Sequence, residues 1–181
     1  MRNKLFSPPP DYIISGGKKY NINTDFRVWV DICNVMADEK ISAKDKLCFL
    51  LINGYCDTLP DNMGEAVSAL IGFMNKYERK NHEKKDRTPV FSFLKDEALI
   101  YAAFFQQYGI NLYTEQLHWW EFLALLSALD DNTAFMRIVG YRSVDCAKIK
   151  DENTRRFYRK MKNRYRLCDK VDDEEIASVL G

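Results

Sequence analysis

Residues 91–129 form the most apolar and most aromatic stretch of the chain, and they place a strong requirement on the rest of the fold. They read FSFLKDEALIYAAFFQQYGINLYTEQLHWWEFLALLSAL. The pattern predicts a first helix over residues 96–108, a stop at Gly109, and a second helix that begins near Thr114 or Glu115. Each helix is apolar around most of its circumference, and such a helix must be enclosed by other elements. We therefore expect this helical pair to lie at the centre of the fold.

The remainder of the chain contains segments that are suited to covering this pair. Apolar residues recur at helical spacing in several of them, and the last is rich in arginine and lysine. Two β-prone runs near the N-terminus flank Gly16-Gly17, which predicts a β-hairpin. The sequence therefore predicts a mainly α fold, a single compact bundle of about seven helices with a small N-terminal β-hairpin. The covering helices are expected at residues 25–38, 42–54, 61–77, 133–140 and 154–168.

Side chains that accept a hydrogen bond from a first-turn amide mark where these helices begin. The candidates are Thr24 or Asp25, Ser42, Asp61-Asn62, residues 130–133, and Asp151, Asn153 or Thr154. Gly140 is expected to end the 133–140 helix. Helical spacing also predicts that Leu47 and Met63 point into the core.

We interpret all 181 residues as one helical domain. Hydrophobic residues make up 46% of the chain and charged residues 29%, an ordinary globular balance, so a packed core is expected. Three segments are expected at its periphery: an extended arm at 1–10 that ends in three prolines, a charged loop at 76–88, and an acidic C-terminal end at 169–181.

Cysteine usage and the N-terminus favour the cytoplasm. The five cysteines are scattered and form no CxxC pair, which is typical of reduced thiols. The first twelve residues lack the apolar core of a secretion signal. The longest apolar run, in the second central helix, is shorter than the roughly 20 residues that a membrane span needs. We expect a cytoplasmic protein with no membrane partner.

Motifs for catalysis, cofactor binding and metal binding are missing from the sequence. No Gly-rich phosphate loop and no GxSxG motif is present, and the two histidines, His82 and His118, are too far apart to predict a metal site. His118 and Glu121 are natural acid–base partners, but at three residues apart on a helix they are expected to be surface neighbours. We predict no catalytic, cofactor or metal residues and a non-enzymatic protein.

The basic helix at 154–168 is the strongest surface feature. Its exposed residues are the candidates for partner binding. They could meet an acidic protein surface, the phosphates of a nucleic acid, or the acidic end of the chain itself. A formal net charge of +1 argues against nucleic acid as the partner. The candidate residues are Arg155, Tyr158, Arg159, Lys162 and Arg166.

Several motifs occur in an order that resembles one protein family. INTDFRVW (22–29) follows a GGKKY turn, IYAAF (100–104) leads into QYGI (107–110), and LHWWEF (117–122) leads into two leucines. YRS (141–143) and the IKD entry (149–151) to the basic helix complete the set. Together they resemble the bacteriophage gp-fifteen family of siphophages and prophages of Gram-positive bacteria. The similarity covers residues 8–167.

The resemblance implies a role in tail assembly. Genes of this family usually lie among tail genes, just before the tape measure gene. That position is typical of tail assembly chaperones, which keep the tape measure protein soluble and recruit tube subunits. The implied partners are therefore the tape measure protein and the tail tube subunit. The family provides no catalytic or cofactor residues to assign.

Two alternatives remain open from the sequence. One is a structural component at the head–tail joint, in which case the protein would be found in the virion. The other is a nucleic-acid-binding regulator that uses the helix at 154–168.

Overall fold

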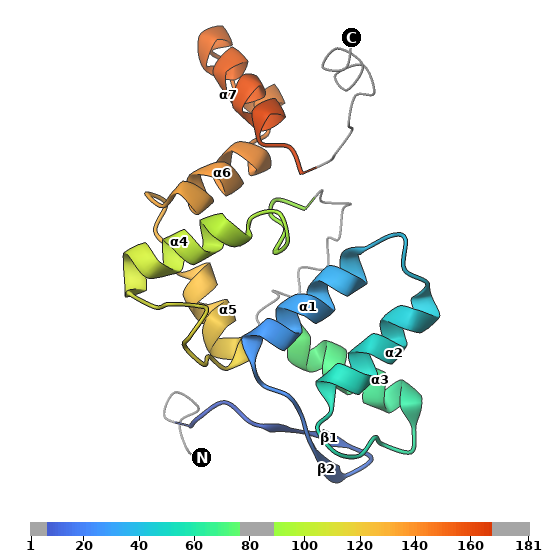
Figure 1. Cartoon of the computed structure of the whole chain (residues 1–181). Helices are drawn as coiled ribbons and strands as arrows, with labels where there is room; N and C mark the ends of the chain where they lie inside the picture. The colour runs from blue at the N-terminus through green and yellow to red at the C-terminus, as the bar shows by residue number, and fades with distance from the viewer. Residues whose placement is uncertain (1–6, 77–88, 168–181) are drawn as a thin grey trace, which may run out of the picture.

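The computed structural model describes residues 7–76 and 89–167, which contain seven α-helices and one antiparallel two-stranded sheet (Figure 1). The prediction of a mainly α fold with an N-terminal hairpin is confirmed. The elements, in chain order, are β1 (Tyr12–Ser15), β2 (Lys18–Asn21), α1 (Phe26–Ala37), α2 (Ala43–Gly54), α3 (Met63–Met74), α4 (Glu97–Tyr108), α5 (Trp119–Ser127), α6 (Ala134–Ser143), a 3-10 turn η2 (Cys146–Lys148) and α7 (Glu152–Arg164).

The β-hairpin closes through Gly16 and Gly17, whose φ angles are 54° and 77°. Two consecutive positive φ values are what a tight two-residue hairpin turn requires, and glycine adopts them without steric cost. The strands pair with Ser15 opposite Lys18. The hairpin lies beneath α1–α3 in Figure 1, and β1 packs against α3. A bridge between Ile22 and Tyr55 joins the chain after β2 to the end of α2.

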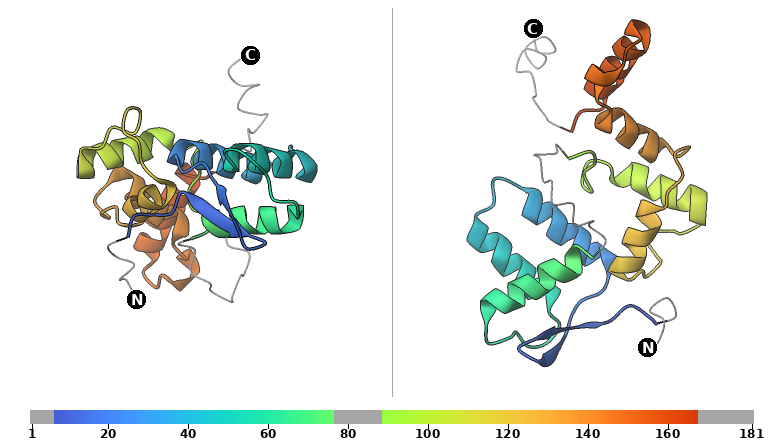
Figure 2. Two further views of the ribbon diagram at one scale, coloured as in Figure 1. Left: turned by 90° about the horizontal axis from the view of Figure 1, so that it is seen from below. Right: turned by 180° about the vertical axis from the view of Figure 1, so that it is seen from behind.

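The helices of the main body lie in two layers. Seen from below in Figure 2 (left), α4, α1 and α2 lie in one layer, and α3 and α5 lie in the other. The central pair of the sequence prediction, α4 and α5, is therefore divided between the layers. The α6 and α7 helices extend away from this body, and α7 projects furthest (Figures 1 and 2).

Aromatic side chains fill the space between the layers. Trp29 of α1 and Trp119 of α5 are 0% and 2% exposed, and their ring centroids are 6.2 Å apart. Each of the three tryptophans donates its indole N–H to a backbone carbonyl: Trp29 to Asn23, Trp119 to Met74, and Trp120 to Phe73. Buried indoles that keep a hydrogen-bond partner add large apolar area without a desolvation penalty.

Helix beginnings match the capping residues well, with one exception. Asp25, Ser42, Thr133 and Asp151 each accept a hydrogen bond from a first-turn amide. The α5 helix, in contrast, begins at Trp119 and not near Thr114 or Glu115. Residues 115–118 are instead held against the start of α1 by long-range hydrogen bonds.

Three other local predictions are wrong. The α6 helix continues through Gly140 to Ser143, because Val144 is the residue that leaves helical geometry. Leu47 and Met63 are 39% and 52% exposed, since α2 and α3 bury neighbouring positions instead. The central α4 helix is not enclosed on all sides, because Phe105 is 55% exposed. Gly109 does end α4, with a φ of 68°.

Parts of the predicted periphery lie outside the described residues. Only residues 7–10 of the arm at 1–10 are described, and they form no helix or strand. Of the charged loop at 76–88, the structure describes Lys76, whose Nζ lies 4.7 Å from the centre of the Trp120 ring. The acidic end at 169–181 lies wholly outside the described residues.

Arg142 attaches the projecting helices to the main body. Its guanidinium forms a two-pronged ion pair with Asp96, the residue before α4, at 2.6 and 2.9 Å. It also donates to the backbone carbonyls of Val90 and Tyr165, so one side chain joins α6 to α4 and to the end of α7. The side chains of Arg142 and Asp96 are 10% and 3% exposed, and a pair this deeply buried depends on both partners.

Arg142→Met should therefore lower the free energy of unfolding by about 3–5 kcal/mol, because it leaves the Asp96 carboxylate buried without its cation, with the Ser92 amide as its remaining donor. Urea denaturation followed by circular dichroism measures the change. Lys148→Ala is the matched control: that side chain is 85% exposed and pairs with Asp145 at 3.6 Å, so its loss should cost less than about 1 kcal/mol. Equal effects of the two substitutions would contradict this account of Arg142.

Candidate functional site

The five predicted partner-binding residues, four on α7 and Arg166 just after it, do not share one exposed face. Arg155 donates to the Ile149 carbonyl at 3.3 Å, and Lys162 donates to the Val144 carbonyl at 2.9 Å. Both side chains therefore tie α7 to the connection that precedes it. Tyr158 is half-buried, with its ring 6.2 Å from that of Tyr141.

Arg159 and Arg166 are exposed, as predicted. Arg159 belongs to an outer face of α7 that is mainly cationic and carries one large, 48% exposed apolar side chain, Phe157, whereas Arg166 lies just beyond the end of the helix. On this face Arg156 forms an exposed ion pair with Glu152 at 3.6 Å. The pairing of these cations with the acidic end of the chain remains a prediction, because that end lies outside the described residues. The other exposed cations are Lys160 and Arg164.

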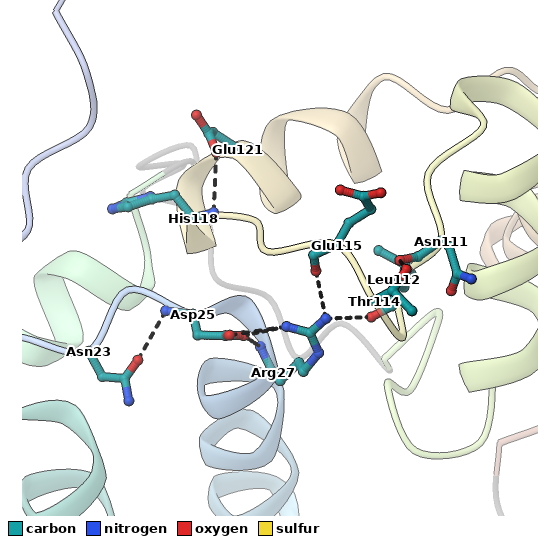
Figure 3. Close-up of polar contacts among 9 residues, drawn as sticks. All are labelled: Asn23, Asp25, Arg27, Asn111, Leu112, Thr114, Glu115, His118 and Glu121. Carbon is teal, nitrogen blue, oxygen red and sulfur yellow. Dashed lines mark hydrogen bonds and ion pairs between the residues drawn. The ribbon is translucent and has the colours of Figure 1, made fainter.

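A second surface, which the sequence did not reveal, is built around Arg27 (Figure 3). Asp25 caps α1 by accepting a hydrogen bond from the Arg27 amide at 2.9 Å, and its carboxylate also pairs with the Arg27 guanidinium at 3.0 Å. The same guanidinium donates to the carbonyls of Leu112 and Glu115 at 2.9 and 2.6 Å. One arginine thus fixes the connection between α4 and α5 onto the start of α1.

Backbone hydrogen bonds complete this junction. The Phe26 amide donates to the Leu117 carbonyl at 3.1 Å, and the Trp119 amide donates to the Thr24 carbonyl at 2.7 Å. Because the Leu117 carbonyl and the Trp119 amide are engaged with α1, the chain here cannot continue as the first turn of α5. The junction therefore explains why α5 begins later than its apolar pattern predicts.

An apolar groove of about 280 Å³ opens beside the junction, between α1 and α4. Its floor is made by Phe26, Ile100 and Phe122, which are 5%, 4% and 1% exposed. Leu94 and Tyr113 line it at the surface and are 68% and 67% exposed. Exposed apolar side chains around an apolar groove are typical of a protein interaction site.

The groove also has charged edges. Asp31 of α1 and Glu97 of α4 both line it and both are exposed. Arg27 lines it as well, but its charge is already paired with Asp25. Large apolar residues in the connections on either side of α4, such as Leu94 and Tyr113, were the available sequence signal for this surface.

His118 has a structural role at the start of α5, on the other side of the junction. Its Nδ1 accepts a hydrogen bond from the Trp120 amide at 3.0 Å, and its own amide donates to the Glu121 carboxylate at 3.2 Å. With Nδ1 as an acceptor, Nε2 carries the proton and donates to the Pro10 carbonyl at 3.2 Å. His118 and Glu121 are therefore a reciprocal helix cap, and the expectation of two surface neighbours within one helix is wrong.

Burial lowers the pKa of His118 from its ordinary value of 6.5, against smaller opposing effects from the Pro10 hydrogen bond and the nearby carboxylates of Glu121 and Asp11. The cap explains why this matters for stability, because protonation of Nδ1 would remove the acceptor for the Trp120 amide.

Within residues 7–76 and 89–167, no cluster of histidine, cysteine and acidic side chains has the arrangement needed to hold a metal ion. In the same part of the chain, no helix has both the length and the apolar character needed to cross a membrane.

Arg27→Met should lower the free energy of unfolding by about 1–3 kcal/mol, because the carbonyls of Leu112 and Glu115 lose a charged donor. Amide hydrogen exchange should accelerate selectively in residues 112–119, which the guanidinium holds in place. Arg137→Met is the control, since Arg137 is exposed and has no ion pair among the described residues; its effect should stay within about 0.5 kcal/mol. If amide hydrogen exchange in residues 112–119 is unchanged in Arg27→Met, Arg27 does not hold this connection in place.

Acid should destabilise the protein through His118. A folded-state pKa below that of the unfolded chain means that the unfolded chain takes up the proton first, so stability is retained above about pH 6.5 and declines as the pH falls further. His118→Asn keeps a capping acceptor but does not titrate, so it should flatten the stability profile between about pH 7.5 and 5.5. His82→Asn removes the chain's other histidine and is the control. A profile that flattens only in His82→Asn would contradict the assignment.

Comparison with known proteins identifies a family. The sequence model of the family described as "Bacteriophage Gp15 protein" matches residues 10–167. No curated protein and no solved structure matches the chain significantly. The match spans the junction motifs around Asp25, Arg27 and His118 and extends to the end of α7. Because it covers most of the molecule, the chain belongs to the bacteriophage Gp15 protein family, the gp-fifteen family that its motifs resemble.

Proposed function

We propose that this phage protein is a non-enzymatic tail morphogenesis factor, a tail assembly chaperone that binds helices of the tape measure protein in the host cytoplasm. The observation that carries the proposal is the apolar groove between α1 and α4. Its floor consists of buried aromatic and aliphatic side chains, and Leu94 and Tyr113 remain largely exposed beside it.

The groove suits an amphipathic helix better than an extended peptide. Its walls are two helices, α1 and α4, and within the described residues the sheet lies on another side of the molecule. A bound helix would place one or two large apolar side chains on Phe26 and Phe122. Each side chain that becomes fully buried contributes roughly 1.5–3 kcal/mol, so a few anchors give reversible binding. Reversibility is what a chaperone needs, because its client must later be released into the tail.

The outer face of α7 supplies a second contact in this proposal. Arg159 is an exposed cation on α7, the helix that projects from the body in Figure 1, and the exposed Arg166 follows the end of that helix. They would attract acidic parts of the tape measure protein or of the tail tube subunit and so raise the association rate. Arg155 and Lys162 take no part, since both are bonded to backbone carbonyls within the protein.

The same cationic face favours a nucleic-acid-binding regulator as the second candidate. A mobility shift on random DNA that weakens steeply with salt would support that function. The protein content of purified virions distinguishes a structural role at the head–tail joint. A joint component is present in the virions, and a chaperone is absent from them.

Leu94→Glu should weaken capture of tape measure fragments at least about tenfold, because it places a carboxylate where an apolar anchor is expected. The side chain is 68% exposed, so the substitution should leave the fold intact. The matched control is Ile52→Glu, at a position on α2 that is 74% exposed and does not line the groove. Co-purification with immobilised fragments measures the effect. Equal retention of both variants would refute the groove as the binding site.

A further inference from the structure

We infer that the groove between α1 and α4 selects a cationic partner, an amphipathic helix that carries lysine or arginine beside its apolar anchors. This inference rests on the proposed function of the groove and specifies the chemistry of its occupant. Some charges at the groove are already paired, and two carboxylates are not.

The carboxylates of Asp31 and Glu97 are the uncompensated charges. They come from the two opposite walls, since Asp31 lies on α1 and Glu97 opens α4. Within residues 7–76 and 89–167, neither has an ion-pair partner. Both carboxylates are exposed, and an exposed charge acts over the Debye length of about 8 Å at physiological salt.

The neighbouring cations do not offset them. Arg27 forms its ion pair with Asp25 at 3.0 Å, and its other nitrogen is bonded to the carbonyls of Leu112 and Glu115. Lys95, beside the edge residue Leu94, does not line the groove, and its ammonium donates to the Leu167 carbonyl at 2.6 Å. The groove therefore presents an apolar floor between two free negative charges.

A helix that fits this arrangement has a defined pattern. Large apolar residues three and four positions apart would lie on Phe26 and Phe122, and the residues flanking them on both sides would meet Asp31 and Glu97. Lysine or arginine at the flanks gains a favourable contact on each wall, whereas glutamate there is repelled by both. The apolar floor thus provides most of the binding affinity, and the charges at the edges select which helices bind.

Three synthetic helical peptides of about 20 residues test the inference. They share one leucine stripe and carry all-lysine, all-glutamine or all-glutamate flanks. Fluorescence anisotropy of labelled peptide measures Kd for the full chain at about 0.05 and 0.3 M salt. The lysine peptide should bind about tenfold more tightly than the glutamate peptide at low salt, with a smaller difference at high salt.

Charge reversal in the protein provides the control. Asp31→Lys with Glu97→Lys should invert the order of the three peptides. Asp61→Lys with Asp131→Lys makes the same change in net charge at exposed positions that do not line the groove, so it should preserve the order. Asp61 precedes α3 much as Glu97 opens α4, so both reversals place a lysine near a helix start.

The outcomes separate this inference from the proposed function. If all three peptides bind equally and Leu94→Glu weakens all of them, the groove binds helices but the charge selection is refuted. If no peptide binds and tape measure fragments are not captured, both the selection and the proposed function are overturned. If the groove is instead covered by a second copy, sedimentation will show a dimer that Leu94→Glu dissociates and no peptide will bind, which also overturns the inference.

Discussion

The attachment of the chain before α5 to the start of α1 determines how the rest of the molecule is arranged. Asp25 caps α1 and orients Arg27, and Arg27 reaches two carbonyls in the connection that follows α4. Backbone hydrogen bonds strengthen the same junction: the Trp119 amide donates to the Thr24 carbonyl, and the Phe26 amide donates to the Leu117 carbonyl. With α5 anchored here, Trp119 enters the core beside Trp29. The ring centroid of Phe122 then lies 4.7 Å from that of Phe26. The motif residues 22–29 and 117–122 therefore have a physical reason for occurring together: they are the two sides of one junction.

The groove is a consequence of this junction. Both α1 and α4 lie over α5, and Phe122 contacts Phe26 from one and Phe104 from the other, with stacked rings at 4.7 and 5.1 Å. Each of these helices is thus packed on the layer below, while the space between them is left to an open apolar groove. The core and the groove share one aromatic residue, because Phe122 packs against Phe26 and Phe104 and also lines the groove floor. Among the described residues, every buried side-chain nitrogen or oxygen has a hydrogen-bond partner, so the polar interior is already satisfied.

Local features of the sequence were the most predictable. Caps at Asp25, Ser42, Thr133 and Asp151, and stops or turns at Gly109 and Gly16-Gly17, all lie where the pattern placed them. Predictions about burial were weaker, since Leu47, Met63 and Phe105 are exposed although they fall on apolar stripes. A stripe states which side chains are apolar, but the position of the neighbouring helix decides which part of the stripe is covered. The basic helix shows the same limit: its position was predicted, whereas the inward bonds of Arg155 and Lys162 depend on the preceding connection.

The sequence by itself determined the family, through motifs that run along most of the chain. It also determined the helical class, the hairpin and most helix ends, because these depend on interactions between residues a few positions apart. Tertiary structure alone decided where α5 begins, what Arg27 binds and where the groove opens. Arg27 and Leu112 are 85 residues apart in the chain, and no periodicity in either segment indicates that they meet. The junction, the buried Asp96–Arg142 pair and the groove all arise from contacts between distant segments, and such contacts exist only after the core has set the distances between them.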